Sequence, residues 1–174
     1  MEIKTAGELM IALDKYPHIP HRHTLRQAIA EFQKWEIEIQ GRRSLPRVVL
    51  IFDDNNQLMG MVRRRDILRG LEPTFLSGAR SEISRKLFDV KVDPNIAEFS
   101  YEKFLKHMKD HAERPVEEIM LPIISTVDYK DHIMKVISEL VGQNVSLLPV
   151  LKDGKVVGVV RSVDVFQEIS NYLL

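Results

Sequence analysis

The feature that most constrains the fold of this chain is an internal repeat. Two segments share the pattern Gly-apolar-apolar-x-x-x-Asp, followed directly by two further apolar residues. Gly60 corresponds to Gly158 and Asp66 to Asp164, at the same offset along the chain. Because matching segments of a repeat adopt the same local structure, we expect two similar halves rather than one continuous sheet or bundle.

Several elements recur in the same order around this pattern. A short helix ending at Met10 or Met120 is followed by an extended piece containing proline, at 17–20 or 122–127. An amphipathic helix is predicted next in each half, because apolar residues recur at helical spacing. These apolar residues are Leu25, Ala28, Ile29 and Phe32 in the first half and Ile133, Val136, Ile137, Leu140 and Val141 in the second.

Each half then continues with a β-hairpin and a final helix. Apolar runs at 48–52 and 59–62 flank a polar turn, and runs at 145–151 and 156–160 flank Lys-Asp-Gly. An Asp-Gly pair such as Asp153-Gly154 between two apolar runs is a strong hairpin signal. The order of helices and strands therefore places the chain in the α+β class.

The matching elements divide the chain into three parts. Residues 1–71 form the first repeat and 114–174 the second, and residues 72–113 have no counterpart. This insertion is highly charged and is predicted to be helical. Its expected apolar faces consist of Ile83, Leu87 and Phe88 on one helix and Phe99, Phe104, Leu105 and Met108 on another. We expect it to pack on the repeats or to contact a separate effector protein.

Composition excludes several classes of function. Lys plus Arg equals Asp plus Glu, at 25 each, so the chain lacks the basic excess of a general nucleic-acid binder. Without cysteine there is no disulfide and no thiolate nucleophile. No apolar run approaches the roughly 20 residues that cross a bilayer, and no signal-peptide pattern begins the chain, so we expect a cytoplasmic protein. No nucleophile-and-base constellation or phosphate-binding P-loop is present, which argues against an enzyme.

The two ordered repeats resemble the CBS domain family, and their pairing is similar to a Bateman module. The second copy shows the resemblance best, through Leu148-Pro-Val150 and the segment from Gly158 to Asp164. The resemblance implies two β-α-β-β-α repeats in a pseudo-twofold pair with two clefts between them. It further implies a regulatory, energy-sensing module that binds AMP, ADP, ATP or a related adenosine compound such as S-adenosylmethionine, needs no metal and forms a homodimer.

The resemblance also implies where the sugar and phosphate of such a ligand would bind. Asp66 and Asp164 are expected to accept hydrogen bonds from ribose hydroxyls. Family members that bind nucleotides often have Ser or Thr three residues earlier, whereas this chain has Arg63 and Arg161. A guanidinium can donate two parallel hydrogen bonds to a phosphate. These arginines are therefore expected to bind a phosphate; the alternative is that they point into solvent.

The adenine base is expected beside the extended pieces that precede each long helix. The residues proposed to line it are His18, Ile19, Ser125, Thr126 and Val127, together with Pro149 of the second hairpin. Backbone groups there would read the edge of the base and apolar side chains would sandwich it. For Ile19 and Val127, filling the core is an equally good interpretation.

Two other functions stay open at this point. The pair of repeats would serve as a dimerising scaffold with empty clefts, or as a metal or anion sensor that uses His18, His21 and His23. His107 and His111 also have ligand-capable spacing on a predicted helix. Neither group shows a clear further ligand, so we expect polar loops and a solvated helix face instead.

Overall fold

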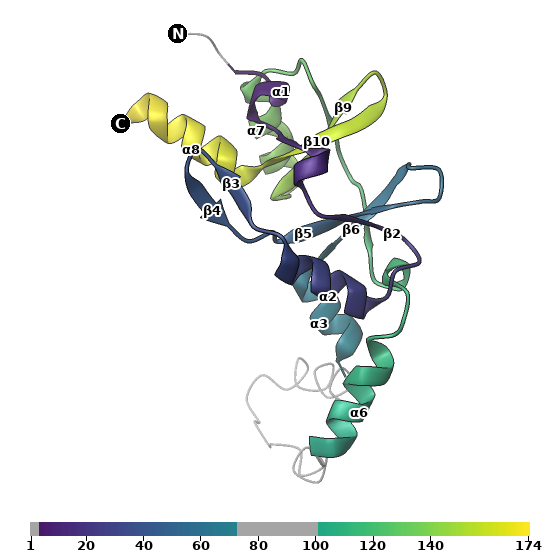
Figure 1. Ribbon diagram of the computed structural model, residues 1–174. Coiled ribbons are helices and arrows are strands. Elements are labelled where there is room, and N and C mark those ends of the chain that lie inside the picture. Colours follow the sequence, from purple (N-terminus) through teal and green to yellow (C-terminus); the bar gives the residue numbers. More distant parts are fainter. Residues whose placement is uncertain (1–3, 73–100) are drawn as a thin grey trace, which may run out of the picture.

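The computed structural model describes residues 4–72 and 101–174 (Figure 1). The first half contains α1 (Ala6–Leu9), β1 (Ile11–Ala12), a 3-10 helix η1 (Leu13–Lys15), β2 (His18–Pro20), α2 (Leu25–Lys34), β3 (Ile37–Ile39), β4 (Arg42–Ser44), β5 (Val48–Phe52), β6 (Leu58–Arg63) and α3 (Arg64–Leu71). The rest contains α6 (Tyr101–His111), a 3-10 helix η2 (Val116–Glu118), β7 (Leu121–Pro122), β8 (Val127–Asp128), α7 (Ile133–Gly142), β9 (Leu147–Lys152), β10 (Lys155–Arg161) and α8 (Ser162–Leu173).

These elements form two four-stranded sheets of the same design. One has the strand order β2-β5-β6-β7 and the other β8-β9-β10-β1. In each, an antiparallel hairpin (β5–β6 or β9–β10) pairs in parallel with the strand that precedes the long helix α2 or α7. A parallel neighbour requires a crossover, and α2 and α7 supply it. The α+β class and the pair of repeats are thus confirmed.

The core lies on both faces of the sheets, as β5 illustrates. All five of its residues are buried. Because side chains alternate along a strand, Val49 and Ile51 point into the core beneath α2 and α3, whereas Val48, Leu50 and Phe52 point toward the other sheet. An all-apolar strand in this sequence is therefore a strand covered on both sides, by helices on one and by the second repeat on the other.

The two halves exchange their edge strands. β1 of the first half pairs with β10 of the second, and β7 of the second half pairs with β6 of the first. At each crossing the repeated glycine permits a close approach. A Cβ on Gly158 would lie 2.4 Å from the carbonyl oxygen of Ile11, and one on Gly60 would lie 2.5 Å from that of Leu121. The repeated glycine is therefore required by strand exchange between the halves.

The short segments next to the exchanged strands cross over as well. Ala6 of α1 is fully buried in the core of the second half, and its amide donates to the carbonyl of Asp131 at 2.7 Å. Conversely, Val116 of η2 is buried in the core of the first half, and its amide donates to the carbonyl of His23 at 2.7 Å. The upstream element of each sequence repeat thus completes the other repeat's fold.

One hairpin breaks the pseudo-twofold symmetry. The first half joins its long helix to its sheet through residues 35–47, which the sequence shows only as a longer connection, and these residues form the β3–β4 hairpin. Its turn residues, Gln40 and Gly41, both have positive φ (51° and 75°), as a tight two-residue hairpin requires. In Figure 1 the hairpin extends from the first half to α8 of the second.

The insertion between the repeats is helical where the structure describes it. α6 contacts α3, and Met108 packs against the core of the first half. The predicted face formed by Ile83, Leu87 and Phe88, and the residue Phe99, lie outside the described residues. Among the described helices none is long and apolar enough to cross a membrane.

Replacing Gly158 by alanine tests whether the close approach of β1 to β10 requires glycine. The added methyl group would meet the backbone of Ile11 and the sulfur of Met10 at 2.8 Å, so β1 must shift. We expect the free energy of unfolding to fall by about 1–3 kcal/mol, measured by urea denaturation.

Gly142→Ala is the matched control for this variant. A Cβ there meets nothing within 4 Å at the end of α7, and alanine favours a helix over glycine by up to about 1 kcal/mol. Equal midpoints of unfolding for the two variants would contradict the role assigned to the glycine.

Candidate functional site

The repeated Arg and Asp form the same paired arrangement in both halves. Arg161 donates from Nε and Nη2 to the two carboxylate oxygens of Asp164, at 2.6 and 2.7 Å. Arg63 holds Asp66 in the same way, at 2.9 and 3.0 Å. The arginine precedes each last helix and the aspartate lies three residues later in its first turn, so the guanidinium reaches the carboxylate and two parallel bonds fix both groups. Each arginine therefore orients the aspartate predicted to bind ribose.

The aspartate of the first half is the more deeply buried of the two, whereas Arg63 is more exposed than Arg161. Asp66 is 1% exposed, and its Oδ2 also accepts from the backbone amide of Arg63 at 2.9 Å. Burial alone raises the pKa of this carboxyl, but the hydrogen bonds and charge of Arg63 outweigh it and bring the pKa below its usual value. Asp66 is thus ionised, and its carboxylate is already supplied with donors.

The pair in the second half borders a cleft of about 620 Å³. Its walls come from three places: the α1–β1 segment, the β3–β4 hairpin and the start of α8. Asp164 has a side chain 12% exposed, and a carboxylate has lone pairs enough to accept ligand hydroxyls while keeping Arg161. Arg63 and Asp66 do not border this cleft.

Two residues that sequence reasoning missed lie beside the Arg161–Asp164 pair. Arg161 also donates from Nη1 to the hydroxyl of Ser44 in β4 at 3.0 Å, so its side chain, 12% exposed, does not point into solvent. Tyr16 is fully buried, and its hydroxyl donates to the carbonyl of Val48 at 2.9 Å. Burial raises the pKa of Tyr16, which keeps this donor protonated. The unusual length of the connection that holds Ser44 is the only signal the sequence offers for either residue.

The residues proposed to line the adenine lie elsewhere. His18, Ile19 and Thr126 border a second cavity of about 690 Å³ between the turns of the two hairpins. Its rim is polar, with Asn55, Gln57 and Lys155 from the two turns. The structure therefore brings three of the base-contact candidates together, but in a different cavity from Arg161 and Asp164.

The other base-contact candidates are engaged in the fold. Val127 is 2% exposed within the core of the second half, and Pro149 is buried in the central strand β9. The Ser125 hydroxyl donates to Glu139 of α7 at 2.7 Å. Ile19 fits both the core and the ligand-site interpretation, because it is 3% exposed in the core and also borders the 690 Å³ cavity. Whether any of these residues contacts a ligand stays a prediction.

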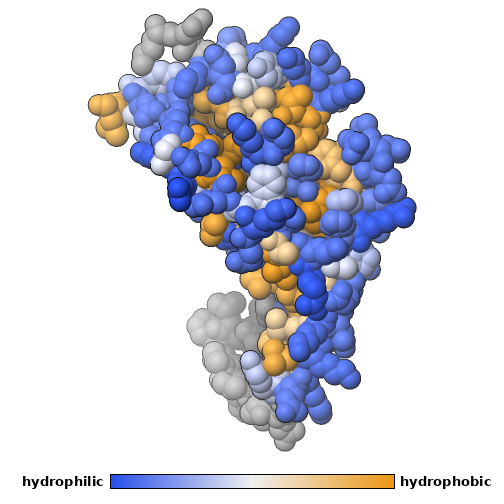
Figure 2. All heavy atoms as spheres, viewed as in Figure 1, coloured by the Kyte–Doolittle hydropathy of each residue, from blue (hydrophilic) through white to orange (hydrophobic). Residues whose placement is uncertain are grey.

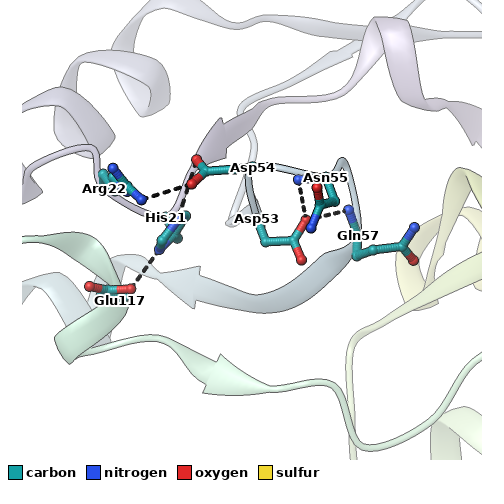
Figure 3. A network of polar contacts seen from close by, with 7 residues as sticks. All are labelled: His21, Arg22, Asp53, Asp54, Asn55, Gln57 and Glu117. Carbon is teal, nitrogen blue, oxygen red and sulfur yellow. Dashed lines mark hydrogen bonds and ion pairs between the residues drawn. The ribbon is translucent and has the colours of Figure 1, made fainter.

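A histidine links the two halves beside the turn of the β5–β6 hairpin (Figure 3). His21 lies between Asp54 of that turn and Glu117 of η2, with Nδ1 2.6 Å from Glu117 and Nε2 3.5 Å from Asp54. Arg22 pairs with Asp54 at 2.8 Å. The hydrogen bond with Glu117 raises the pKa of His21, because it favours the charged imidazolium.

The histidines do not converge on a metal site in the part of the chain that the structure describes. His18 Nδ1 donates to the carbonyl of Tyr16 at 2.8 Å, while His21 faces carboxylates. The rings of His107 and His111 stack with centroids 3.8 Å apart on α6, and His111 contacts the Gly70 carbonyl. Within residues 4–72 and 101–174, no three His, Asp or Glu side chains are grouped to hold an ion.

Residues 6–73 and 116–171 match the family model of the CBS domain. The chain belongs to the CBS domain family. No curated protein sequence matches it. The two matched segments begin at α1 and η2, the elements that the halves exchange, so the CBS repeats of this chain are interlocked rather than side by side.

Solved structures show the same fold at low sequence identity. The CBS domain of a CBS domain-containing membrane protein from Sphaerobacter thermophilus is 16% identical, with a TM-score of 0.62 over 94% of this chain and 86% of that one. CBSX2 in complex with AMP is 16% identical, with a TM-score of 0.61 over 98% of each chain. Hypoxic Response Protein I with two coordinated zinc ions is 19% identical, with a TM-score of 0.55 over 94% and 98%.

The His21 contact predicts a dependence of stability on pH. Because the folded state raises the pKa of this imidazole above its unfolded value of about 6.5, the stabilisation is complete below that pH. It is lost as pH rises through the folded pKa. We expect NMR titration of His21 to give a midpoint above 6.5, and Glu117→Gln to lower it.

Glu118→Gln is the matched control, since Glu118 pairs with Arg114 at 2.6 Å and not with His21. It should leave the titration of His21 unchanged. A midpoint at or below 6.5 in the unaltered chain would show that the contact with Glu117 is absent in solution.

Proposed function

We propose that this CBS pair is a regulatory, non-catalytic module that binds an adenine nucleotide in a cleft between its repeats. The observation that carries the proposal is the Asp164 cleft, where a carboxylate held by Arg161 borders a cavity of about 620 Å³ walled by both halves. The same fold binds AMP in CBSX2, which supports a nucleotide as the class of ligand.

In the proposal, the aspartate and the arginine of each Arg-Asp pair have different roles. Asp164 accepts the ribose hydroxyls through the lone pairs that Arg161 leaves free. Arg161 holds the carboxylate in place and presents positive charge to the phosphate. We propose the same roles for Asp66 and Arg63 in the first half, although they border neither the 620 Å³ nor the 690 Å³ cavity and the deeper burial of Asp66 makes its carboxylate harder to reach.

Regulation follows from the position of the cleft between the halves. A ligand in this cleft contacts both β1 and α8. If the protein has two conformations that differ in the distance between these elements, the ligand favours the conformation that it binds more tightly, and the shift is set by the difference between its two affinities. We propose that the output acts on a separate protein in the cytoplasm, through residues 72–113. Of that segment the structure describes residue 72 and residues 101–113.

Calorimetric titration with AMP, ADP and ATP tests the proposed site. We expect at least one of them to bind, and Asp164→Asn to weaken that binding about tenfold or more, because hydrogen bonds to a charged acceptor are lost. Asp66→Asn should show whether the pair in the first half is also used.

Asp110→Asn, an exposed change on α6, is the control for the loss of one negative charge. Binding that survives unchanged in both Asp66→Asn and Asp164→Asn would overturn the site. No binding of any of the three at millimolar concentration would favour the alternative of a scaffold without ligand.

The surface of the helices supports the further proposal of a homodimer. On α7, Met134 and Val141 lie two turns apart and are 67% and 75% exposed, and on α8 Phe166 and Leu173 repeat this spacing at 72% and 78%. Figure 2 shows hydrophobic surface at the exposed end of α8. Large apolar side chains spaced in this way on two neighbouring helices are typical of a surface that a partner covers.

Sedimentation of a Val141→Glu, Phe166→Glu double variant tests this interface. We expect the unaltered chain to be a dimer at micromolar concentration and the variant to be a monomer, because two buried carboxylates per subunit oppose association. Leu68→Glu, at an equally exposed position on α3, is the comparison variant. A monomeric unaltered chain would contradict the proposed dimer.

A further inference from the structure

The β3–β4 hairpin makes the surroundings of the two Arg-Asp pairs unequal. In the second half only residues 143–146 join α7 to β9, whereas in the first half residues 35–47 make the corresponding connection. The hairpin reaches over the Asp164 cleft, where Arg42 donates to the side-chain oxygen of Gln167 on α8 and Ser44 accepts from Arg161. The added segment of the first repeat therefore contributes side chains to the site of the second.

Most charges that border this cleft are already neutralised. Lys4 pairs with Glu168 at 2.7 Å, and Arg161 pairs with Asp164. Arg43 of the hairpin lies 3.8 Å from Glu38 and from a second hairpin carboxylate, that of Glu36.

Two cations that border the cleft have no carboxylate partner among the described residues. The guanidinium of Arg42 contacts only the neutral amide of Gln167, and Lys15, at the end of η1, has no ion pair. The carboxylate of Glu8 on the same wall is engaged by the backbone amide and hydroxyl of Thr5, at 2.8 and 2.9 Å. These hydrogen bonds leave the negative charge of Glu8 in place, so the side chains that border the cleft sum to one positive charge: Lys4, Lys15, Arg42, Arg43 and Arg161 against Glu8, Glu38, Asp164 and Glu168. Arg42 and Lys15 still present their charges without a carboxylate in contact, which favours an anion beside them.

We infer that the Asp164 cleft selects nucleotides with two or more phosphates, and that Arg42 and Lys15 are the residues that contact the added phosphates. This inference rests on the proposed function and names the class of ligand. A monophosphate brings only one phosphate, which lies nearest to Arg161. A di- or triphosphate also neutralises the two free cations, and arginine and lysine are the side chains best suited to phosphate oxygens.

The hairpin is suited to this role because its base is fixed. Ile37 is 3% exposed and packs in the core between the two sheets with Leu147 and Val159. Arg42 therefore projects from an anchored two-stranded element rather than from a loop, and less conformational entropy is lost when a ligand binds. Selection by charge then requires no movement of the hairpin.

Calorimetric affinities for ATP and AMP test the inference in the full chain. We expect ATP to bind at least tenfold more tightly than AMP. Arg42→Gln and Lys15→Gln should each weaken ATP about tenfold and AMP less than threefold, because only the longer phosphate chain reaches these side chains. Both positions are exposed, so these variants should fold, as unchanged thermal unfolding would verify.

Two matched variants separate contact from general charge. Arg43→Gln removes the same charge from the same hairpin, but from a side chain that already has carboxylate partners, so ATP affinity should change little. Gln167→Glu keeps the contact with Arg42 and supplies it with a carboxylate. It should therefore reduce the preference for ATP as Arg42→Gln does.

The outcomes distinguish this inference from the proposed function. Equal affinity for AMP and ATP, or equal weakening of both by Arg42→Gln, overturns the inference and leaves nucleotide binding intact. Inorganic tripolyphosphate provides a probe without adenine: if it binds through Arg42 and no nucleotide does, the charge selection stands and the adenine proposal fails. If neither nucleotide nor tripolyphosphate binds, both are overturned.

Discussion

At Gly60 and Gly158 the backbone of one half passes against the backbone of the other at a distance that no side chain permits. The rest of the molecule depends on these two crossings. They seat β1 and β7 at the edges of sheets built mainly from the opposite half, and this pairing carries α1 and η2 into the opposite cores. Near the crossing at Gly158, β1 forms one wall of the cleft that Asp164 borders, so the strand exchange also shapes this cleft.

Symmetry of the backbone does not make the two sites equal. Both halves place an Arg-Asp pair at the start of the last helix, with nearly the same bond geometry. The surroundings differ, since Asp66 is 1% exposed, whereas Asp164 faces a cavity enlarged by the hairpin wall. A pair of repeats can thus keep a common fold while an insertion in one of them changes the surroundings of one Arg-Asp pair.

The repeat pattern was enough to predict the class, the order of elements and the turn at Asp153-Gly154, whose positive φ values confirm the hairpin. Local signals of this kind depend on residues close together in sequence. The exchange of edge strands was not predictable, because the local sequence pattern that ends at Met10 or Met120 does not depend on which sheet the following strand joins. The Arg63 and Arg161 contacts were missed for a similar reason: sequence spacing shows that a guanidinium lies three residues before a carboxylate, but only the backbone direction at the helix start shows that the two face each other.

The strand exchange also governs how the halves stay together. Separated from each other, each half would present a sheet without its edge strand and a strand without its sheet, two defects that only the opposite half repairs. The connection between them therefore acts mainly by raising the effective concentration of one half around the other. The entropic cost of closing a loop grows only by about 0.6 kcal/mol for each doubling of its length, so the length of this connection can vary at little cost to either sheet. Evolution is accordingly free to use that segment for other purposes.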